Sequence, residues 1–199
     1  MPQLVVASHN RKKLAELQTL LQPLGWDARS VAEFSATVPE ETALSFVENA
    51  LLKARHATQV SGLPAIADDS GLEVDALAGA PGVYSARYAG ADASDADNNR
   101  KLLEALREVP ASKRGARFVS ALVFLRHAAD PVPLIAIGSW RGRILEAPQG
   151  NNGFGYDPLF YVEALGCSAA ELDSASKNRI SHRAQAMAQL LTQLQAVHA

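Results

Sequence analysis

Apolar residues recur along the chain with two different periods, one typical of strands and one typical of helices. Apolar runs predict strands at residues 4–7, 26–31, 65–69, 117–125 and 132–140. Helical spacing of leucine and alanine predicts four helices: between Asn10 and Pro23, at 43–61, at 95–106, and from Ser181 to the C-terminus. Strands and helices therefore alternate, which is typical of an α/β fold.

The stretch "PAIADDSGLEVD", residues 64–75, breaks this pattern with two adjacent carboxylates. A short apolar run ends in Asp68 and Asp69, and Ser70-Gly71 is typical turn chemistry. We therefore expect a strand, a tight turn at Ser70-Gly71 and a second extended segment. Because side chains alternate along a strand, Asp68 and Asp69 should point to opposite faces and have different roles.

Gly and Pro mark two further loops, at residues 77–90 and 147–158. No internal repeat or low-complexity linker interrupts the chain. The expected architecture over residues 1–199 is a mixed sheet with flanking helices, and the chain length suits one domain or two small lobes around a cleft.

Composition narrows the class of protein. The chain has 199 residues, of which 48% are hydrophobic, and a net charge of −2, so a sizeable core is expected and a nucleic-acid partner is not. The single cysteine, Cys167, excludes a disulfide within one chain and fits a reducing compartment. The N-terminus lacks a signal-peptide pattern, and no apolar run reaches membrane-spanning length. We therefore expect a cytoplasmic protein with no membrane partner.

The segment "SHNRKKLAE", residues 8–16, joins a predicted strand to a predicted helix. Such a junction offers backbone N–H groups and the positive end of the helix dipole to an anion. Lys12 and Lys13 oppose that dipole, and a bound phosphate beside Ser8 and Asn10 would explain them. The alternative is a pair of solvated surface lysines.

The acidic residues Glu40, Glu41, Asp68 and Asp69 suit a hard divalent cation. Carboxylate oxygens without a histidine–cysteine cluster favour Mg²⁺ or Mn²⁺ over zinc. The alternative is an ordinary turn, which would explain Asp69 but would leave Asp68 without a reason.

Two later segments also favour a nucleotide. In "GNNGFGYDP", residues 150–158, glycines surround Phe154, which offers a flat face to a planar base or else anchors an ordinary loop. In "SKNRISHRAQA", residues 176–186, the cations Lys177, Arg179 and Arg183 form a local positive patch or else a charged solvent-facing cap. Together the four segments predict a nucleotide phosphate site with a base pocket.

These motifs occur in an order that resembles a known family. "SHNRKKLAE", "SFVENALLKARHA", "AIADDSGLEVDALAGAPGVYSARYAG", "NNGFGYDP" and "KNRISHRAQA" are similar to the inosine triphosphate pyrophosphatase-like family, whose bacterial members are XTP/dITP pyrophosphohydrolases. The resemblance covers nearly the whole chain. It implies hydrolysis of non-standard purine nucleoside triphosphates to the monophosphate and pyrophosphate, one or more Mg²⁺ ions per subunit, an elongated two-lobed α/β fold with the site in the cleft, and a homodimer.

The resemblance also implies a role for each matching residue. Asp69 would be the proton acceptor and a metal contact, with Glu40 or Glu41 holding the metal and Asp68 close by. The residues that would bind substrate are Ser8, His9, Asn10, Arg11, Lys12 and Lys13 at the triphosphate, Lys53 near the phosphates, Ser70 at the substrate, Phe154, Gly155, Tyr156, Asp157 and Lys177 in the base pocket, and His182 and Arg183 closing on the base.

Two other functions use the same residues. A phosphatase that releases orthophosphate could use the same Mg²⁺ and lysines, and a nucleotide-sensing module would bind without turnover. The sequence leaves open which purine is preferred and which of Glu40 and Glu41 reaches the metal.

Overall fold

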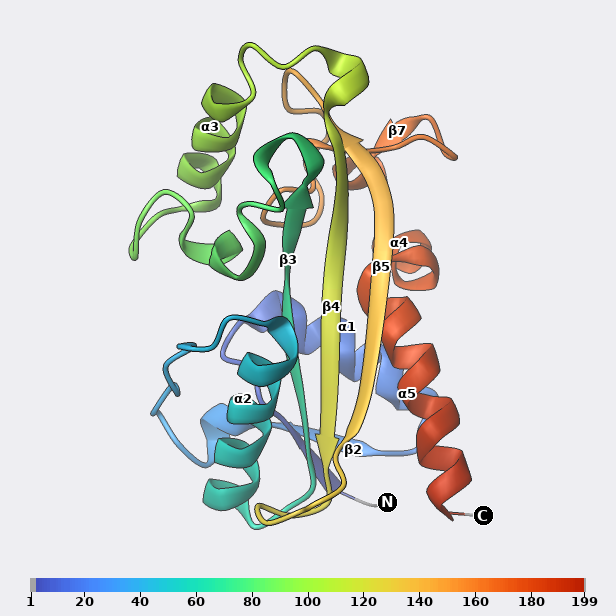
Figure 1. Ribbon diagram of the computed structural model, residues 1–199. Coiled ribbons are helices and arrows are strands. Elements are labelled where there is room, and N and C mark those ends of the chain that lie inside the picture. The colour runs from blue at the N-terminus through green and yellow to red at the C-terminus, as the bar shows by residue number, and fades with distance from the viewer. Residues whose placement is uncertain (1–2, 199) are drawn as a thin grey trace. The chain divides into compact units, whose positions relative to one another are not determined.

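Strand β1 (Gln3–Val6) and helix α1 (Arg11–Leu21) form where the first apolar run and the leucine repeat predict them (Figure 1). The computed structural model describes residues 3–198. Its other strands are β2 (Asp27–Ser30), β3 (Ala65–Val74), β4 (Gly115–Leu125), β5 (Leu134–Ile144), β6 (Phe160–Val162) and β7 (Cys167–Ser168). Its other α-helices are α2 (Phe46–Ser61), α3 (Asp95–Ala105), α4 (Ser174–Ile180) and α5 (His182–His198).

The strands form one mixed sheet in the order β2-β1-β3-β4-β5-β6-β7. β1 pairs in parallel with both β2 and β3, and parallel neighbours need a crossover connection, here provided by the segments that contain α1 and α2. β6 pairs antiparallel with β5 and with β7. The expected α/β class, a mixed sheet with flanking helices, is confirmed.

The chain divides into two compact units. The first contains Met1–Asp69, Ser120–Gly138 and Arg183–Ala199, and the second contains Ser70–Val119 and Ser139–His182. Strands β3, β4 and β5 each contribute residues to both units. None of the helices within residues 3–198 combines the length and apolar character needed to cross a bilayer.

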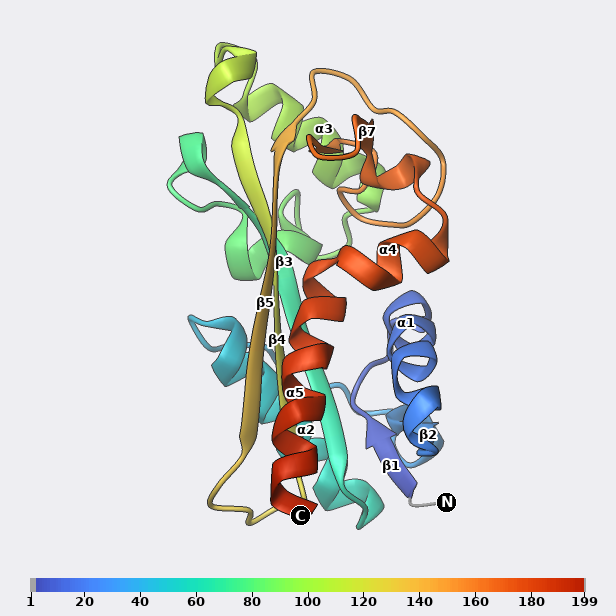
Figure 2. The same ribbon diagram turned by 90° about the vertical axis from the view of Figure 1, so that its right-hand side faces the viewer.

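In the first unit, the side chains of β1 alternate between two packed faces. Leu4 and Val6 pack with residues of α1 and α5, whereas Val5 and Ala7 pack with the alanines of α2. Figures 1 and 2 show α2 on one face of these strands and α1 and α5 on the other. Burial on both faces explains why residues 4–7 are all apolar, without polar residues in alternation.

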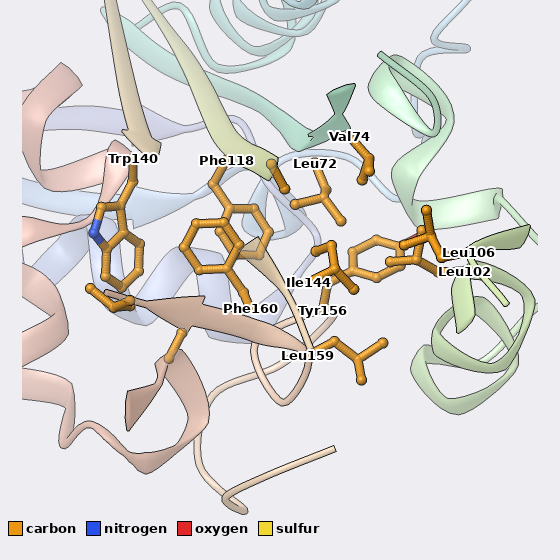
Figure 3. Packing of buried hydrophobic residues seen from close by; sticks show 13 residues of the cluster. Leu72, Val74, Leu102, Leu106, Phe118, Trp140, Ile144, Tyr156, Leu159 and Phe160 are labelled. Carbon is orange, nitrogen blue, oxygen red and sulfur yellow. The ribbon is translucent and has the colours of Figure 1, made fainter. Parts of the chain in front are cut away.

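The second unit has its own core, which is shown in Figure 3. Phe160 of β6 packs its ring 4.5 Å from the ring of Phe118 on β4 and 5.3 Å from that of Trp140 on β5. Leu102 and Leu106, in and just after α3, are fully buried in the same cluster. The second unit is thus stabilised by contacts between strands and a helix that are far apart in the sequence.

Several predicted elements differ from the structure. The turn expected at Ser70-Gly71 is wrong, because β3 runs unbroken from Ala65 to Val74. The N–H of Leu72 donates to Oγ of Ser85, 2.8 Å away. A hydroxyl from a distant residue therefore accepts the hydrogen bond of this strand N–H, at the position where a turn was expected. Helix α2 begins at Phe46 and not at residue 43, because the side chain of Ser45 caps it.

Other elements were missed or predicted too short. β4 and β5 are 11 residues each, and β5 continues to Ile144 beyond the predicted end at residue 140. No pattern in the sequence predicts β6, β7 or α4, which are short and have little periodicity of their own. The helices predicted at 95–106 and from Ser181 correspond to α3 and α5 within one residue at their starts.

Candidate active site

Asn10 is the N-cap residue of α1, and its side chain holds the loop between β1 and α1. Its side-chain oxygen accepts from the N–H groups of Lys12 at 3.0 Å and Lys13 at 3.2 Å, and its own N–H donates to Oγ of Ser8 at 3.2 Å. Two of the N–H groups that could meet a phosphate are therefore capped by the chain itself. His9, Arg11 and Lys12 are exposed, so the cations of this loop are accessible to an anion in solution.

Asp68 lies in a buried network of cations. Its carboxylate accepts a 2.5 Å hydrogen bond from Ser120, and lies 3.1 Å from both Nζ of Lys13 and Nη2 of Arg183. Arg183 is 1% exposed and also pairs with Glu16. Burial alone would raise the pKa of Asp68, but Arg183 and Lys13 outweigh burial and hold that pKa well below its usual range.

Asp69 lies in a second cluster, with Lys53 and Glu41. Nζ of Lys53 lies 2.7 Å from Oδ1 of Asp69 and 2.7 Å from Oε1 of Glu41. Burial raises the pKa of Asp69 to about 6, with Lys53 opposing that shift and Glu41 adding to it. For Lys53, burial lowers the pKa, but the two carboxylates outweigh burial and the net shift is upward. The cluster therefore holds a carboxyl group that titrates close to neutral pH.

The adjacent aspartates contact different helices, as the strand period predicts. Asp68 contacts Lys13 of α1 and Arg183 of α5, whereas Asp69 contacts Lys53 of α2. These helices cover opposite faces of β3 in the first unit (Figure 2). The predicted division of the pair is confirmed, and the cationic contacts of Asp68 favour a supporting role over a metal-binding one.

The two glutamates that the sequence could not separate differ in the structure. Glu41 contacts Lys53, whereas Glu40 is exposed. Among residues 3–198, no three histidine, cysteine or acidic side chains gather at one point. Of the two glutamates, Glu41 shares the ammonium group of Lys53 with Asp69.

The Gly-rich loop of the second unit is organised around Asp157. Oδ2 of Asp157 lies 2.6 Å from Nζ of Lys177 and accepts from the N–H of Phe154 at 2.8 Å. Nζ of Lys177 lies 4.7 Å from the centre of the Phe154 ring, within cation–π range. Gly153 has φ +74°, and a Cβ there would lie 2.1 Å from Oδ2 of Asp157, so only glycine fits. The loop thus brings an aromatic face, a cation and a carboxylate together.

The charged solvent-facing cap considered for Lys177, Arg179 and Arg183 is wrong for two of these three cations. Lys177, His182 and Arg183 are each 5% exposed or less, whereas Arg179 is exposed. Lys177 is held on α4 facing Asp157, and the His182 ring stacks on Phe118 with a centre-to-centre distance of 4.9 Å. Buried cations need partners, and those of Lys177 and Arg183 are the carboxylates of Asp157 and Asp68.

The remaining predicted residues have structural contacts of their own. Tyr156 is buried, and its hydroxyl donates to the carbonyl of Ser85 at 2.8 Å. This bond attaches the Gly-rich loop to the segment that contains Ser85. Burial raises the pKa of the Tyr156 phenol well above its usual value. Ser70 is half-buried in β3, directly after Asp69.

Sequence reasoning missed several residues that support the site. Glu16 and Ser120 hold Arg183 and Asp68, and Ser85 joins β3 to Tyr156. Glu16 stood within the quoted "SHNRKKLAE" motif, three residues after Lys13, so its position on the helix could have drawn attention to it. Ser120 and Ser85 gave no signal, because their partners are 52 and 13 residues away.

Comparison with known proteins gives the class to which this arrangement belongs. The Ham1 family profile matches residues 4–193, and the chain belongs to this family. A dITP/XTP pyrophosphatase of Pseudomonas aeruginosa is 59% identical over 98% of both chains, and one of Xanthomonas campestris is 56% identical over 99% of both. These matches confirm the resemblance that the ordered motifs indicated.

Solved structures agree with this membership. The structure of a HAM1 protein from Coxiella burnetii has a TM-score of 0.90 and 51% identity, covering 98% of this chain and 100% of that chain. A structure of a nucleoside-triphosphatase / dITP/XTP pyrophosphatase from Mycobacterium abscessus has a TM-score of 0.75 and 43% identity, covering 96% and 99%. The fold described above is therefore the fold of this family.

Proposed function

We propose that this protein hydrolyses non-standard purine nucleoside triphosphates, among them dITP, ITP and XTP, to the monophosphate and pyrophosphate. The relatives named dITP/XTP pyrophosphatase match the chain over nearly its full length. The observation that carries the proposal is the Asp69 carboxyl group, which is buried beside Lys53 with a pKa of about 6. A carboxylate in this state is suited to accept a proton near neutral pH.

Asp69 and Glu41 are the residues that would hold a divalent cation. Their oxygens each lie 2.7 Å from Nζ of Lys53, so both carboxylates already converge on one positive centre. This donor set fits Mg²⁺, or Mn²⁺ in its place, because Mg²⁺ commonly takes one or two carboxylates together with waters and substrate phosphates. When bound, the cation would neutralise part of the charge of the triphosphate.

The chain's own residues account for the remaining chemistry. A water molecule attacks the α-phosphorus and its proton passes to Oδ of Asp69, while the bond from the α-phosphorus to the bridging oxygen breaks and pyrophosphate leaves. Lys12 and Lys13 neutralise the negative charge of the triphosphate, and Lys53 fixes the orientation of Asp69 through its 2.7 Å contact. Positioning and charge stabilisation carry most of the rate enhancement in phosphoryl transfer.

Recognition of the base follows from the Gly-rich loop and α4. Phe154 offers a stacking face, and Lys177 or a backbone N–H can donate to the 6-oxo group of hypoxanthine or xanthine. Adenine carries an amino group at that position and leaves the donor unpaired, and sites of this type discriminate by about 10⁴-fold. Asp157 holds the Lys177 ammonium at 2.6 Å, so the donor is in place before substrate arrives.

The function is tested by separating the products formed from dITP, XTP, dGTP and dATP, with Mg²⁺ or with EDTA. We expect pyrophosphate and the monophosphate from dITP and XTP, much slower turnover of dATP, and loss of turnover in EDTA. Orthophosphate as the first product would favour the phosphatase alternative. Tight binding of dITP without hydrolysis at saturating Mg²⁺ would favour the nucleotide-sensing module.

We also propose that the protein is a cytoplasmic homodimer. The single cysteine fits a reducing compartment, and the apolar side chains of Val38 and Leu44 are 59% and 84% exposed, which suits a surface for association. Sedimentation equilibrium decides the assembly, since a mass of one chain at micromolar concentration contradicts the dimer.

A further inference from the structure

Two side chains from the first two turns of α3 bind both backbone polar groups of Gly155. The N–H of Gly155 donates to Oδ2 of Asp95 at 2.8 Å, and its carbonyl accepts from Nδ2 of Asn99 at 2.8 Å. Asp95 and Asn99 are four residues apart and therefore lie on one face of the helix. Two side chains of α3 thus hydrogen-bond to Gly155, which lies 56 to 60 residues further along the chain.

These two hydrogen bonds fix Gly155, the residue that follows Phe154. Asp157 holds the N–H of Phe154 at 2.8 Å, and the N–H of Asp157 donates back to the carbonyl of Phe154 at 3.2 Å. With Gly155 held by α3, the backbone is fixed on both sides of the Phe154 ring. Gly155 has φ +61°, a left-handed conformation that glycine adopts without strain, and the two side chains of α3 bond to it in that conformation.

The hydrogen bonds from Asp95 and Asn99 to Gly155 are separate from the capping of α3. Ser94 is the N-cap, and its capping box partner is Asp97, whose Oδ2 accepts from the N–H of Ser94 at 3.0 Å. Asn99 is a poor helix former, and its Nδ2 donates to Gly155 in addition to the carbonyl of Asp95 at 2.9 Å. Helix stability therefore explains Ser94 and Asp97 but does not explain the bonds to Gly155.

We propose that Asp95 and Asn99 are positioning residues that pre-organise Phe154 for stacking on the purine base. The inference rests on the proposed function, because it assigns the aromatic face to the nucleotide. Binding to a loop that is already ordered costs less than binding to one that must be ordered first. Loss of either bond therefore weakens substrate binding and leaves the chemical step, which Asp69 carries, almost unchanged.

The test compares Asp95→Ala and Asn99→Ala with two matched variants. Asp95→Asn keeps an acceptor for the N–H of Gly155, and Asp97→Ala weakens the α3 cap without touching the loop. Amide hydrogen exchange in peptides covering residues 150–158 reports the order of the loop without any substrate. Steady-state kinetics with dITP and Mg²⁺ then report KM and kcat separately.

We expect faster exchange in residues 150–158 for Asp95→Ala and Asn99→Ala, with KM for dITP raised about 3- to 10-fold, as the loss of one hydrogen bond implies, and kcat within about 2-fold. Asp95→Asn should behave like the wild-type protein in both readouts. Asp97→Ala should lower Tm but leave amide hydrogen exchange in residues 150–158 and the KM for dITP unchanged.

Two results would overturn the inference. One is unchanged exchange in residues 150–158 for both alanine variants, and the other is an equal rise in exchange and KM for Asp97→Ala, which would trace the effect to fraying of α3. If the wild-type protein fails to hydrolyse dITP, the proposed function fails, whereas the exchange measurement still decides whether α3 orders the loop.

Discussion

Replacing Asp69 with asparagine is expected to reduce turnover of dITP by about 10²–10⁴-fold, the range typical of a lost proton acceptor. Asparagine keeps the size of the side chain and an oxygen facing Lys53, but it cannot accept the proton of the attacking water. The measurement is kcat for dITP in saturating Mg²⁺, with pyrophosphate as the detected product.

The fold should survive this substitution, and the pKa of Asp69 explains why. That pKa is about 6 in the folded protein and about 3.9 in an unfolded chain, so ionised Asp69 disfavours folding at pH 7. The penalty disappears as the pH falls through 6 towards 4, where the folded state binds the extra proton. Asp69→Asn should therefore unfold at the same or a higher denaturant concentration than the wild-type protein at pH 7, and near-normal turnover in this variant would contradict the assignment.

Replacing Asp68 with asparagine is expected to lower the free energy of unfolding strongly, in contrast to Asp69→Asn. Arg183 is 1% exposed and depends on Asp68 and Glu16 for its countercharge. Breaking a buried ion pair by removing one partner commonly costs about 3–5 kcal/mol, because it leaves an uncompensated charge in the interior. Denaturant unfolding at pH 7 measures this loss directly.

The pH dependence of that loss gives a second check. The folded-state pKa of Asp68 is depressed, so its contribution is present above the unfolded value near 3.9 and is lost as the pH falls through the lower folded value. The difference between wild-type protein and Asp68→Asn should shrink at acid pH. Glu16→Gln is the matched control, since the Glu16 side chain is 16% exposed and should cost less. No loss for Asp68→Asn would show that Arg183 does not depend on Asp68, and equal losses for the two variants would show that Asp68 contributes no more than Glu16.

Local sequence patterns predicted those parts of the fold that depend on neighbouring residues. The leucine spacing of α1 follows the helical period of 3.6 residues, and the division of Asp68 from Asp69 follows the strand period of two. The turn predicted at Ser70-Gly71 was wrong because its dipeptide preference is weaker than the pairing of a ten-residue strand, which Ser85 supports from 13 residues away.

The candidate site was predictable only in part, because its contacts join distant segments. The sequence indicated carboxylates near a metal and cations near phosphates, but it could not show that Lys53 lies between Glu41 and Asp69. That contact depends on the packing of α2 against β3, and no pattern within either segment encodes it. For the same reason the hydrogen bond from Asn99 to Gly155 could not be predicted, because the two residues are 56 positions apart in the sequence.

The central claim is that water attacks the α-phosphorus of a purine nucleoside triphosphate. It is tested most directly by hydrolysing dITP in ¹⁸O-labelled water and weighing the products by mass spectrometry. We expect one ¹⁸O atom in dIMP and none in pyrophosphate. Label in pyrophosphate with unlabelled dIMP, or label in released orthophosphate, would contradict it.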